Sequence, residues 1–208
     1  MLPARFNRIP SPIESVWLWS WWQSSADVPF YASLLSAQEQ QRLQSMTSPQ
    51  RQREFICGRG GLRWLLSYLL QRSPQELEII QTASGKPVLA NSRWQFNLSH
   101  SQGLVLCAIA EGVLVGVDVE YRLRSCPMER VMRRWAKTDS FQAWQKLPQQ
   151  QQSEEFWRWW TQHEAIAKAL GIGISRSTTL TLPHHIATCT IYQKYIASVC
   201  TVELASSA

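Results

Sequence analysis

The 208 residues lack several features that are typical of membrane proteins, secreted disulfide-bonded proteins and zinc-binding proteins. No uncharged apolar run reaches the roughly 18 residues of a membrane-spanning helix, and no basic segment with an apolar stretch and a cleavage site indicates a signal peptide. The five cysteines show no CxxC spacing, which suggests neither a disulfide framework nor a zinc site. We therefore expect a cytoplasmic protein that has no contact with a membrane.

Acidic residues are the scarcer charge, because 15 Asp and Glu stand against 21 Lys and Arg and the net charge is +6. A basic surface favours anionic partners such as nucleic acid, phosphorylated cofactors or acidic proteins, and charge alone does not choose among them. Hydrophobic residues make up 45% of the chain and aromatic residues 11%. This composition excludes intrinsic disorder, and the length suits one large domain or two small ones.

Helix-capping signals recur along the sequence. Ser36 followed three residues later by Glu39 is a capping box, and Pro49 is typical of a first helical turn. Ser153 before two glutamates predicts another helix start, and Gly171 predicts a helix end. Together with apolar spacings of three and four residues, these signals predict helices at 36–44, 49–69, 127–135 and 153–170, and the glutamines at 149–152 are expected to form a loop.

Segments of alternating or β-branched apolar residues predict strands. Turn signals at Gln102-Gly103 and Glu111-Gly112 separate three of them, which we expect to be consecutive antiparallel strands. The order of elements predicts an α+β fold of two similar halves, residues 1–112 and 113–208, each a long helix packed on a small antiparallel sheet. The predicted strands are 13–22, 96–101, 104–110, 113–120, 178–182, 186–192 and 195–202.

Two carboxylates share one face of a predicted strand. Asp118 and Glu120 are two residues apart, while Val117 and Val119 point the other way, into a core. Neighbouring carboxylates repel each other unless a cation lies between them, and a hard cation such as Mg²⁺ takes oxygen ligands. The alternative interpretation is a solvated acidic strand end.

An acid and a base share a face of a predicted helix. Glu164 and Lys168 are four residues apart, in the order that favours attraction, and a plain surface ion pair is the commoner meaning of this spacing. If Glu164 joined Asp118 and Glu120, the three acids would form a metal site. Lys168 would then lie one turn away, where its ammonium can hold a phosphate.

Ser99 and His100 do not form a catalytic dyad, because neighbours on a strand point to opposite faces. His100 fits better as a hydrogen-bond donor to an anion, with a half-buried structural histidine as the alternative. A predicted helix carries Arg51, Arg53, Arg59 and Arg63, and arginine binds phosphate well. The alternative for these arginines is a solvated basic face.

In their order along the chain, these stretches resemble the Sfp-type 4'-phosphopantetheinyl transferases. The resemblance covers about residues 35–202. The matching motifs are Gly85-Lys86-Pro87, Phe96-Asn97-Leu98-Ser99-His100-Ser101, Gly116-Val117-Asp118-Val119-Glu120, and Trp160-Thr161 through Glu164-Ala165 to Lys168.

The resemblance implies a pseudo-symmetric monomer of two halves, with coenzyme A bound in the cleft between them. Members of this family move the phosphopantetheine arm of coenzyme A onto a serine of an apo acyl or peptidyl carrier protein and release adenosine 3',5'-bisphosphate. The reaction uses Mg²⁺, or Mn²⁺ in its place. Carrier proteins of fatty-acid, polyketide and nonribosomal-peptide synthesis are acidic, which suits a net charge of +6.

The resemblance also implies a role for each matching residue. Glu164 is the expected base for the serine proton, directly or through a metal-bound water. The implied metal ligands are Asp118, Glu120 and Glu164; the implied pyrophosphate contacts are His100, Lys168 and Ser99; the implied 3'-phosphate contacts are Arg59 and, more weakly, Arg51 and Arg53; and Lys86 and Pro87 are implied to line the adenine.

The chain departs from the family pattern at two positions. His163 stands where the family usually has a lysine before the helix glutamate, which predicts weaker phosphate binding at higher pH. Gly58 stands where a basic residue is common. Beyond the motifs, the arginines at 130, 133 and 134 are either partner contacts or a solvated helix face.

Two other classes of function compete with a transferase. A Mg²⁺-dependent nuclease or phosphodiesterase would also use clustered acids, a lysine and a basic surface. Against it, no extended basic stripe with interleaved aromatics lies beside Asp118, so nucleic acid is not an expected partner. A binding module without catalysis would use the tryptophan-rich surface, and it predicts that loss of Asp118 or Glu164 leaves function intact.

Overall fold

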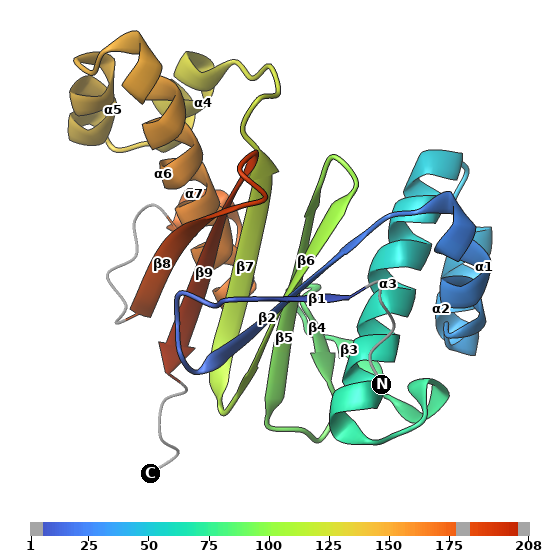
Figure 1. Ribbon diagram of the computed structural model, residues 1–208. Helices are drawn as coiled ribbons and strands as arrows, with labels where there is room; N and C mark the ends of the chain where they lie inside the picture. Colours follow the sequence, from blue (N-terminus) through green and yellow to red (C-terminus); the bar gives the residue numbers. More distant parts are fainter. Residues whose placement is uncertain (1–5, 178–183, 204–208) are drawn as a thin grey trace.

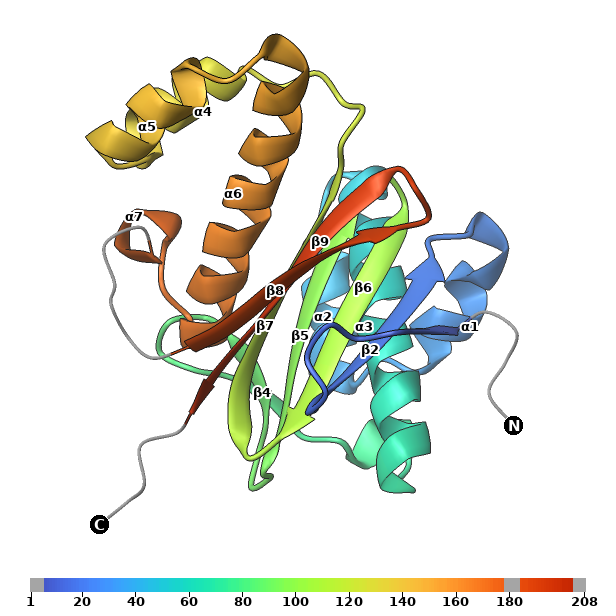
Figure 2. The same ribbon diagram turned by 60° about the vertical axis from the view of Figure 1, so that its left-hand side comes forward.

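Two larger antiparallel sheets stand next to each other, and one long helix packs against each of them (Figures 1 and 2); strands β3 and β4 form a small third sheet. The computed structural model describes residues 6–177 and 184–203. Helices α3 (Pro49–Leu70) and α6 (Gln149–Leu170) flank the sheets on opposite sides in both views. The predicted α+β fold, with a long helix on an antiparallel sheet in each half, is confirmed.

The first sheet has the spatial order β1-β2-β6-β5. The elements of this part are β1 (Asn7–Ile9), β2 (Val16–Trp22), α1 (Val28–Ser33), α2 (Ala37–Gln44), α3, β3 (Ile79–Gln81), β4 (Pro87–Leu89), β5 (Trp94–Ser101) and β6 (Leu104–Glu111). Buried side chains of α3, among them Leu62 and Leu66, pack with Trp21 and Phe96 of the sheet. Helices α1 and α2 lie along the outer side of α3 (Figure 1).

Helix α3 begins as its local sequence dictates. The hydroxyl of Ser48 accepts a hydrogen bond from the Arg51 amide at the first turn, and Pro49 occupies the first helical position. Two glycines in its middle allow close packing: a Cβ at Gly60 would collide with the backbone of Tyr31, and one at Gly61 would collide with the Trp21 indole.

The second sheet has the order β7-β9-β8, and α6 covers it. The elements of this part are β7 (Val113–Tyr121), α4 (Met128–Trp135), α5 (Thr138–Gln145), α6, α7 (Ile174–Ser177), β8 (His184–Ile191) and β9 (Tyr195–Glu203). Gly116 of β7 makes the close packing of α6 possible, because a Cβ there would collide with the backbone of Ala165 and Ala169. The last turns of α6, which carry the predicted site residues, therefore lie directly on β7.

Four expectations about elements were wrong or incomplete. Helix α6 begins at Gln149, so the glutamines are helical and Pro148 rather than Ser153 precedes the first turn. Strand β2 begins at Val16, and β7 does not pair with β6, because the turn at Gly112 carries the chain over to β9 in the other sheet. Strands β1 and β4 and helices α1, α5 and α7 were not predicted at all. The strand expected at 178–182 lies outside the described residues.

No helix in the described part of the chain combines the length and apolarity that a membrane crossing requires. The five cysteines all carry free thiols, and three of them, including Cys107 and Cys200, are buried.

Candidate active site at the seam between the sheets

The two sheets meet where β5 lies beside β7, and side chains take the place of a backbone ladder there. Oδ1 of Asn97 accepts a hydrogen bond from the Val117 amide at 2.9 Å, and the hydroxyl of Ser99 accepts one from the Val119 amide at 3.2 Å. The hydroxyl of Ser101 accepts one from the amide of Tyr121 at 3.1 Å. We call these three alternate residues of β5 and their partners the seam. The seam fixes the register of β7 against β5.

Asp118 lies in the middle of the seam and binds Lys168. Lys168 Nζ donates to Asp118 Oδ1 at 2.6 Å and to the Ser99 hydroxyl at 3.0 Å, and that hydroxyl donates to the same carboxylate oxygen at 2.8 Å. The Asp118 side chain is only 6% exposed. Its other oxygen, Oδ2, is buried and accepts no hydrogen bond from the described residues. A buried carboxylate oxygen without a donor is costly, so this atom marks a place for a cation or another donor.

Glu120 and Glu164 flank this carboxylate. Glu120 accepts hydrogen bonds from Ser101 at 2.9 Å and from Arg124 at 2.8 Å. Burial, followed by the negative charge of Asp118, raises the pKa of Glu120, and the same two causes in the same order raise the pKa of Glu164. The three acids therefore share one region of unfavourable negative charge that Lys168 offsets only in part.

Fit to a divalent cation can be judged from these groups. Three carboxylates are the right donors for Mg²⁺, and Asp118 Oδ2 is an unsatisfied one among them. As the described side chains stand, however, no three His, Cys, Asp or Glu groups form a ready cluster for a metal ion. Asp118 and Glu120 instead each hold a cationic side chain, Lys168 and Arg124.

His100 is exposed beside the buried Ser99, as strand alternation predicts. It lines a cavity of about 470 Å³ together with Glu120 and Arg124. Arg53 of α3 reaches the same cavity from the other side, where it also donates to the Ser25 hydroxyl at 3.3 Å.

Arg53 and Arg124 are residues that sequence reasoning undervalued or missed. Arg53 was only a weaker candidate for a phosphate contact, and no role was predicted for Arg124. The signal for Arg124 was its place on the turn that follows the acidic strand, four residues after Glu120.

The other predicted phosphate-binding arginines do not reach this cavity. Arg59 pairs with Glu39 at 3.2 Å and lines a separate cavity of about 380 Å³ with Arg42 and Phe55. One of its guanidinium nitrogens, Nη1, is buried and has no hydrogen-bond partner among the described residues. Arg51 is exposed on the first turn of α3.

Lys86 and Pro87 lie at the turn between β3 and β4. The Lys86 ammonium donates to the carbonyl of Ala169 at 2.6 Å and to that of Val115 at 3.2 Å. Burial lowers the pKa of Lys86 to about 8, although the nearby Cys200 thiol acts in the opposite direction. Pro87 begins β4 and is half-buried.

The two departures from the family pattern have different surroundings. His163 contacts the Trp159 carbonyl through Nδ1 at 2.8 Å and lines a cavity with Lys137 and His184, away from His100. Burial is the main cause that lowers the pKa of His163. Gly58 faces open space, because a Cβ there would meet nothing within 4 Å.

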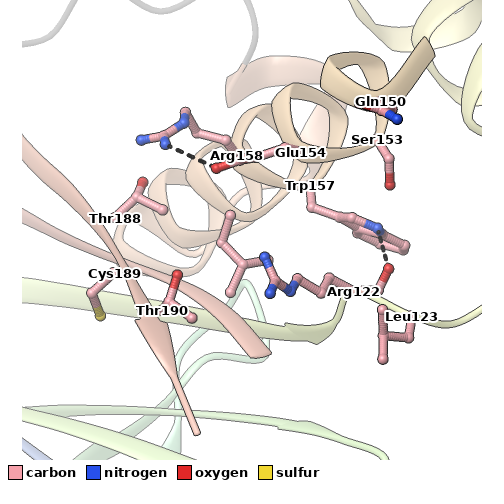
Figure 3. A pocket seen from close by; sticks show the side chains of 11 residues that line it. Arg122, Leu123, Gln150, Ser153, Glu154, Trp157, Arg158, Thr188, Cys189 and Thr190 are labelled. Carbon is pink, nitrogen blue, oxygen red and sulfur yellow. Dashed lines mark hydrogen bonds and ion pairs between the residues drawn. The ribbon is translucent and has the colours of Figure 1, made fainter. Parts of the chain in front are cut away.

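A further cavity lies between α6 and β8, and it holds none of the predicted site residues (Figure 3). Its volume is about 270 Å³. Trp157 and Arg158 of α6 form one wall and Thr188 and Cys189 of β8 form another, while the Trp157 indole donates to the Arg122 carbonyl at 3.0 Å.

Comparison with known proteins gives two matches to family models and several similar proteins. Residues 114–199 match the 4'-phosphopantetheinyl transferase superfamily, and residues 19–112 match the N-terminal part of 4'-phosphopantetheinyl transferases. The chain is similar to the 4'-phosphopantetheinyl transferase HetI of Nostoc sp., with 34% identity over 158 residues, which are 74% of this chain and 67% of that protein.

Two further proteins of the same kind are similar to the chain. The 4'-phosphopantetheinyl transferase AcpT of Escherichia coli is 35% identical over 137 residues, which are 62% of this chain and 63% of that protein. The human L-aminoadipate-semialdehyde dehydrogenase-phosphopantetheinyl transferase is 26% identical over 196 residues, 84% of this chain and 62% of that protein. The chain thus spans about two thirds of the length of the curated relatives it matches.

Proposed function

Because the chain belongs to the 4'-phosphopantetheinyl transferase superfamily, we propose that it transfers the 4'-phosphopantetheine arm of coenzyme A to a serine of an apo carrier protein. The released product would be adenosine 3',5'-bisphosphate. The observation that carries the proposal is the contact of Lys168 and Ser99 with one oxygen of a buried Asp118, whose other oxygen has no donor in the described part of the chain. This arrangement offers both a cation for phosphate and an acceptor for a metal ion.

Phosphate binding is assigned to the cationic side chains around the seam. Lys168, His100 and Ser99 would contact the pyrophosphate, with Arg53 and Arg124 closing the cavity that His100 lines. The adenosine end would occupy the cavity of Arg59. The buried Nη1 of that arginine, which no described residue pairs, suits a 3'-phosphate, and Arg51 would assist from solvent. The backbone of the turn at Lys86, together with Pro87, would line the adenine.

The residues proposed to hold Mg²⁺, or Mn²⁺ in its place, are Asp118, Glu120 and Glu164. Raised pKa values at Glu120 and Glu164 are consistent with this, since burial and then the negative charge of Asp118 disfavour the charged form of both carboxylates, and a cation would offset that cost. When bound, the ion would neutralise phosphate charge and orient the pyrophosphate.

The proposed chemistry is a displacement at phosphorus. The carrier serine oxygen bonds to the β-phosphorus of coenzyme A, the bond from that phosphorus to the bridging oxygen breaks, and the bridging oxygen leaves on the adenosine bisphosphate. Glu164 takes the serine proton, for which a raised pKa suits it. Lys168 and His100 stabilise the negative charge that grows on the leaving phosphate.

The partner proposed for the basic surface is an acidic carrier protein of fatty-acid, polyketide or nonribosomal-peptide synthesis. Arg130, Arg133 and Arg134 of α4 are exposed, which leaves two of them available to an acidic surface while Arg133 pairs with Glu129. We further propose that the protein acts as a monomer of two halves, residues 1–112 and 113–208, in the cytoplasm, where its free thiols would stay reduced.

Intact-protein mass spectrometry tests the proposal directly. Apo carrier proteins from the three pathways are incubated with the protein, coenzyme A and Mg²⁺, and we expect one carrier to gain a single phosphopantetheine mass. Chelator and the Asp118→Asn variant should abolish the gain, whereas Glu129→Gln, the same change at an exposed acid of α4, should not. A folded protein that modifies no carrier and binds no coenzyme A in calorimetry would overturn the proposal.

A further inference from the structure

One half-buried ammonium joins the two parts of the molecule at a distance from the phosphate-binding cavity. Lys86 belongs to the β3–β4 turn of the first part, yet its two acceptors, the carbonyls of Val115 and Ala169, belong to β7 and α6 of the second. An ammonium has three N–H donors. Two of the three are therefore engaged by the protein's own backbone.

The acceptor on α6 is one that the helix itself leaves without a donor. The last four carbonyls of a helix have no intrahelical N–H partner, and Ala169 is among them. At this end the amides of Gly171 and Ile172 both turn back to the Ala167 carbonyl. The Ala169 carbonyl is capped instead by Lys86, from across the molecule.

Packing closes the same turn over the end of α6. Gly171 adopts a φ of +66°, and a Cβ there would meet the Ser84 hydroxyl and come within 3.4 Å of the Lys86 Cβ. The turn at Ser84 and Lys86 thus fits against the C-terminal end of the helix with no room for a further side-chain atom.

Ala169 directly follows Lys168, the residue that holds Asp118. We propose that Lys86 is a positioning residue: its ammonium clamps the last turn of α6 to the first part of the molecule and so holds Lys168 against Asp118 and Ser99. The consequence for catalysis rests on the proposed transferase function. This role differs from that of an adenine contact, because the ammonium serves the backbone of α6 while Pro87 and the turn backbone stay free for a ligand.

The clamp predicts a specific kinetic signature. Without the ammonium, the Ala169 carbonyl loses its donor and the last turn of α6 loosens, so Lys168 is held less well at the pyrophosphate. Misplacement of a catalytic group by about 1 Å can cost around 100-fold in rate. Lys86→Met should therefore lower kcat by at least about 10-fold and leave KM for coenzyme A within about twofold of the wild-type value. Lys86→Arg, which keeps cationic N–H donors, should recover part of kcat.

Hydrogen–deuterium exchange of the protein alone, without coenzyme A or carrier protein, measures the clamp without any assay of transfer. In Lys86→Met the amides of residues 168–172 should exchange at least about 10-fold faster, while those at the start of α6 should be unchanged. Met132→Ala, which opens the buried cluster under α4, serves as a control of reduced stability. It should lower Tm without changing kcat or exchange at 168–172.

Three outcomes would overturn the clamp. Unchanged exchange at 168–172 in Lys86→Met is the first. A rise in KM for coenzyme A with kcat unaltered is the second, since it would make Lys86 a ligand contact. An equal loss of kcat in Met132→Ala is the third, since it would reduce the effect to general instability. If the wild-type protein transfers nothing, the proposed function fails and the exchange result alone decides the clamp.

Discussion

Helices α3 and α6 are both 22 residues long, both cover an antiparallel sheet, and both carry ionic side chains into the interior. In α3 the ionic group is closed around its acid, although Nη1 of Arg59 has no hydrogen-bond partner among the described residues. Arg63, 2% exposed, binds Glu39 and the carbonyls of Pro74 and Leu77, and Arg59 binds the other oxygen of the same Glu39. Both oxygens of that carboxylate are thereby satisfied within the protein.

In α6 the ionic group is open. Lys168 binds one oxygen of Asp118, and the other oxygen is buried and has no donor among residues 6–177 and 184–203. The difference teaches that the same architecture can use a charged cluster in two ways. A cluster whose oxygens are all paired holds elements together, and a cluster with an unpaired oxygen keeps a place for something that arrives from outside.

The largest expected effect comes from breaking the open cluster. Lys168→Met should lower the transfer rate by about 10²–10³-fold, because the cation that offsets charge on the leaving phosphate is lost. Its counterpart in the closed cluster, Arg63→Met, should leave the rate of the folded fraction within about threefold of wild type, since that guanidinium contacts only protein groups. Initial rates measured by separation of apo and holo carrier, corrected for folded protein by circular dichroism, check both. Equal rate losses would remove the distinction between the clusters.

Breaking the closed cluster should act on stability instead. Glu39→Gln leaves Arg59 and Arg63 partly buried without their counter-charge, and removing one partner of a buried ion pair costs about 3 kcal/mol. Urea denaturation should show this as a lower free energy of unfolding at unchanged m value. Glu129→Gln, which removes an exposed ion pair, should cost less than about 1 kcal/mol. A small effect at Glu39 would contradict the structural role given to the closed cluster.

The two clusters also show which contacts could be predicted from the sequence and which could not. Ser36 and Glu39 form the predicted capping box, because both partners lie within one turn of the helix. The second role of Glu39, as the partner of Arg59 and Arg63, joins α2 to α3 and has no local signal. In the same way, alternation put Asp118 on one face of β7, but the Ser99 hydroxyl between Asp118 and Lys168 depends on how two sheets meet.

Helix starts failed where composition misled. Gln149 and the glutamines after it resemble a low-complexity loop, yet they form the first turn of α6. Contacts with the preceding segment hold this turn: the Trp144 indole donates to the Gln152 carbonyl at 2.8 Å, and the side-chain amide of Gln152 donates to the carbonyl of Leu147 at 2.9 Å. Helices α1 and α5 have six and eight residues and no side-chain cap at their starts, so tertiary packing rather than a local signal decides them.

Two glycines, one under α6 and one on α3, give a smaller test of packing against these helices. Gly116→Ala should cost about 2 kcal/mol in the free energy of unfolding, because the added methyl meets helix backbone that cannot move aside. Gly58→Ala in α3, where a Cβ meets nothing, should instead stabilise the protein by up to about 1 kcal/mol through helix propensity. Chemical denaturation of both variants measures the pair. The expectation fails if the two variants shift stability in the same direction.

The smallest effect concerns pH and Lys86. Its pKa is about 8 in the folded protein against an ordinary value of 10.5, so between these values the unfolded chain holds a proton that the folded chain has released. Unfolding then takes up a proton, and the contribution of Lys86 to stability rises with pH over that window. The Cys200 thiol of β9 faces the same ammonium, and its pKa is shifted in the opposite direction, because burial raises it to about 12.

The difference between wild type and Lys86→Met isolates this contribution, since Cys200 and the other groups titrate in both. The difference in free energy of unfolding, wild type minus variant, should increase between pH 8 and 10.5. A difference that stays flat, or that shrinks, would mean that the ammonium keeps an ordinary pKa in the folded protein.

The seam between β5 and β7 has a consequence for how the protein avoids aggregation. Each of these strands would otherwise end its sheet with a row of unpaired backbone groups, the template onto which strands of other chains add. The amides of Val117, Val119 and Tyr121 are already occupied by side chains of the neighbouring sheet, so strand addition at β7 has no vacant donors to use there. A variant that lost the seam would uncover two sheet edges in one molecule, and its first symptom would be poor solubility.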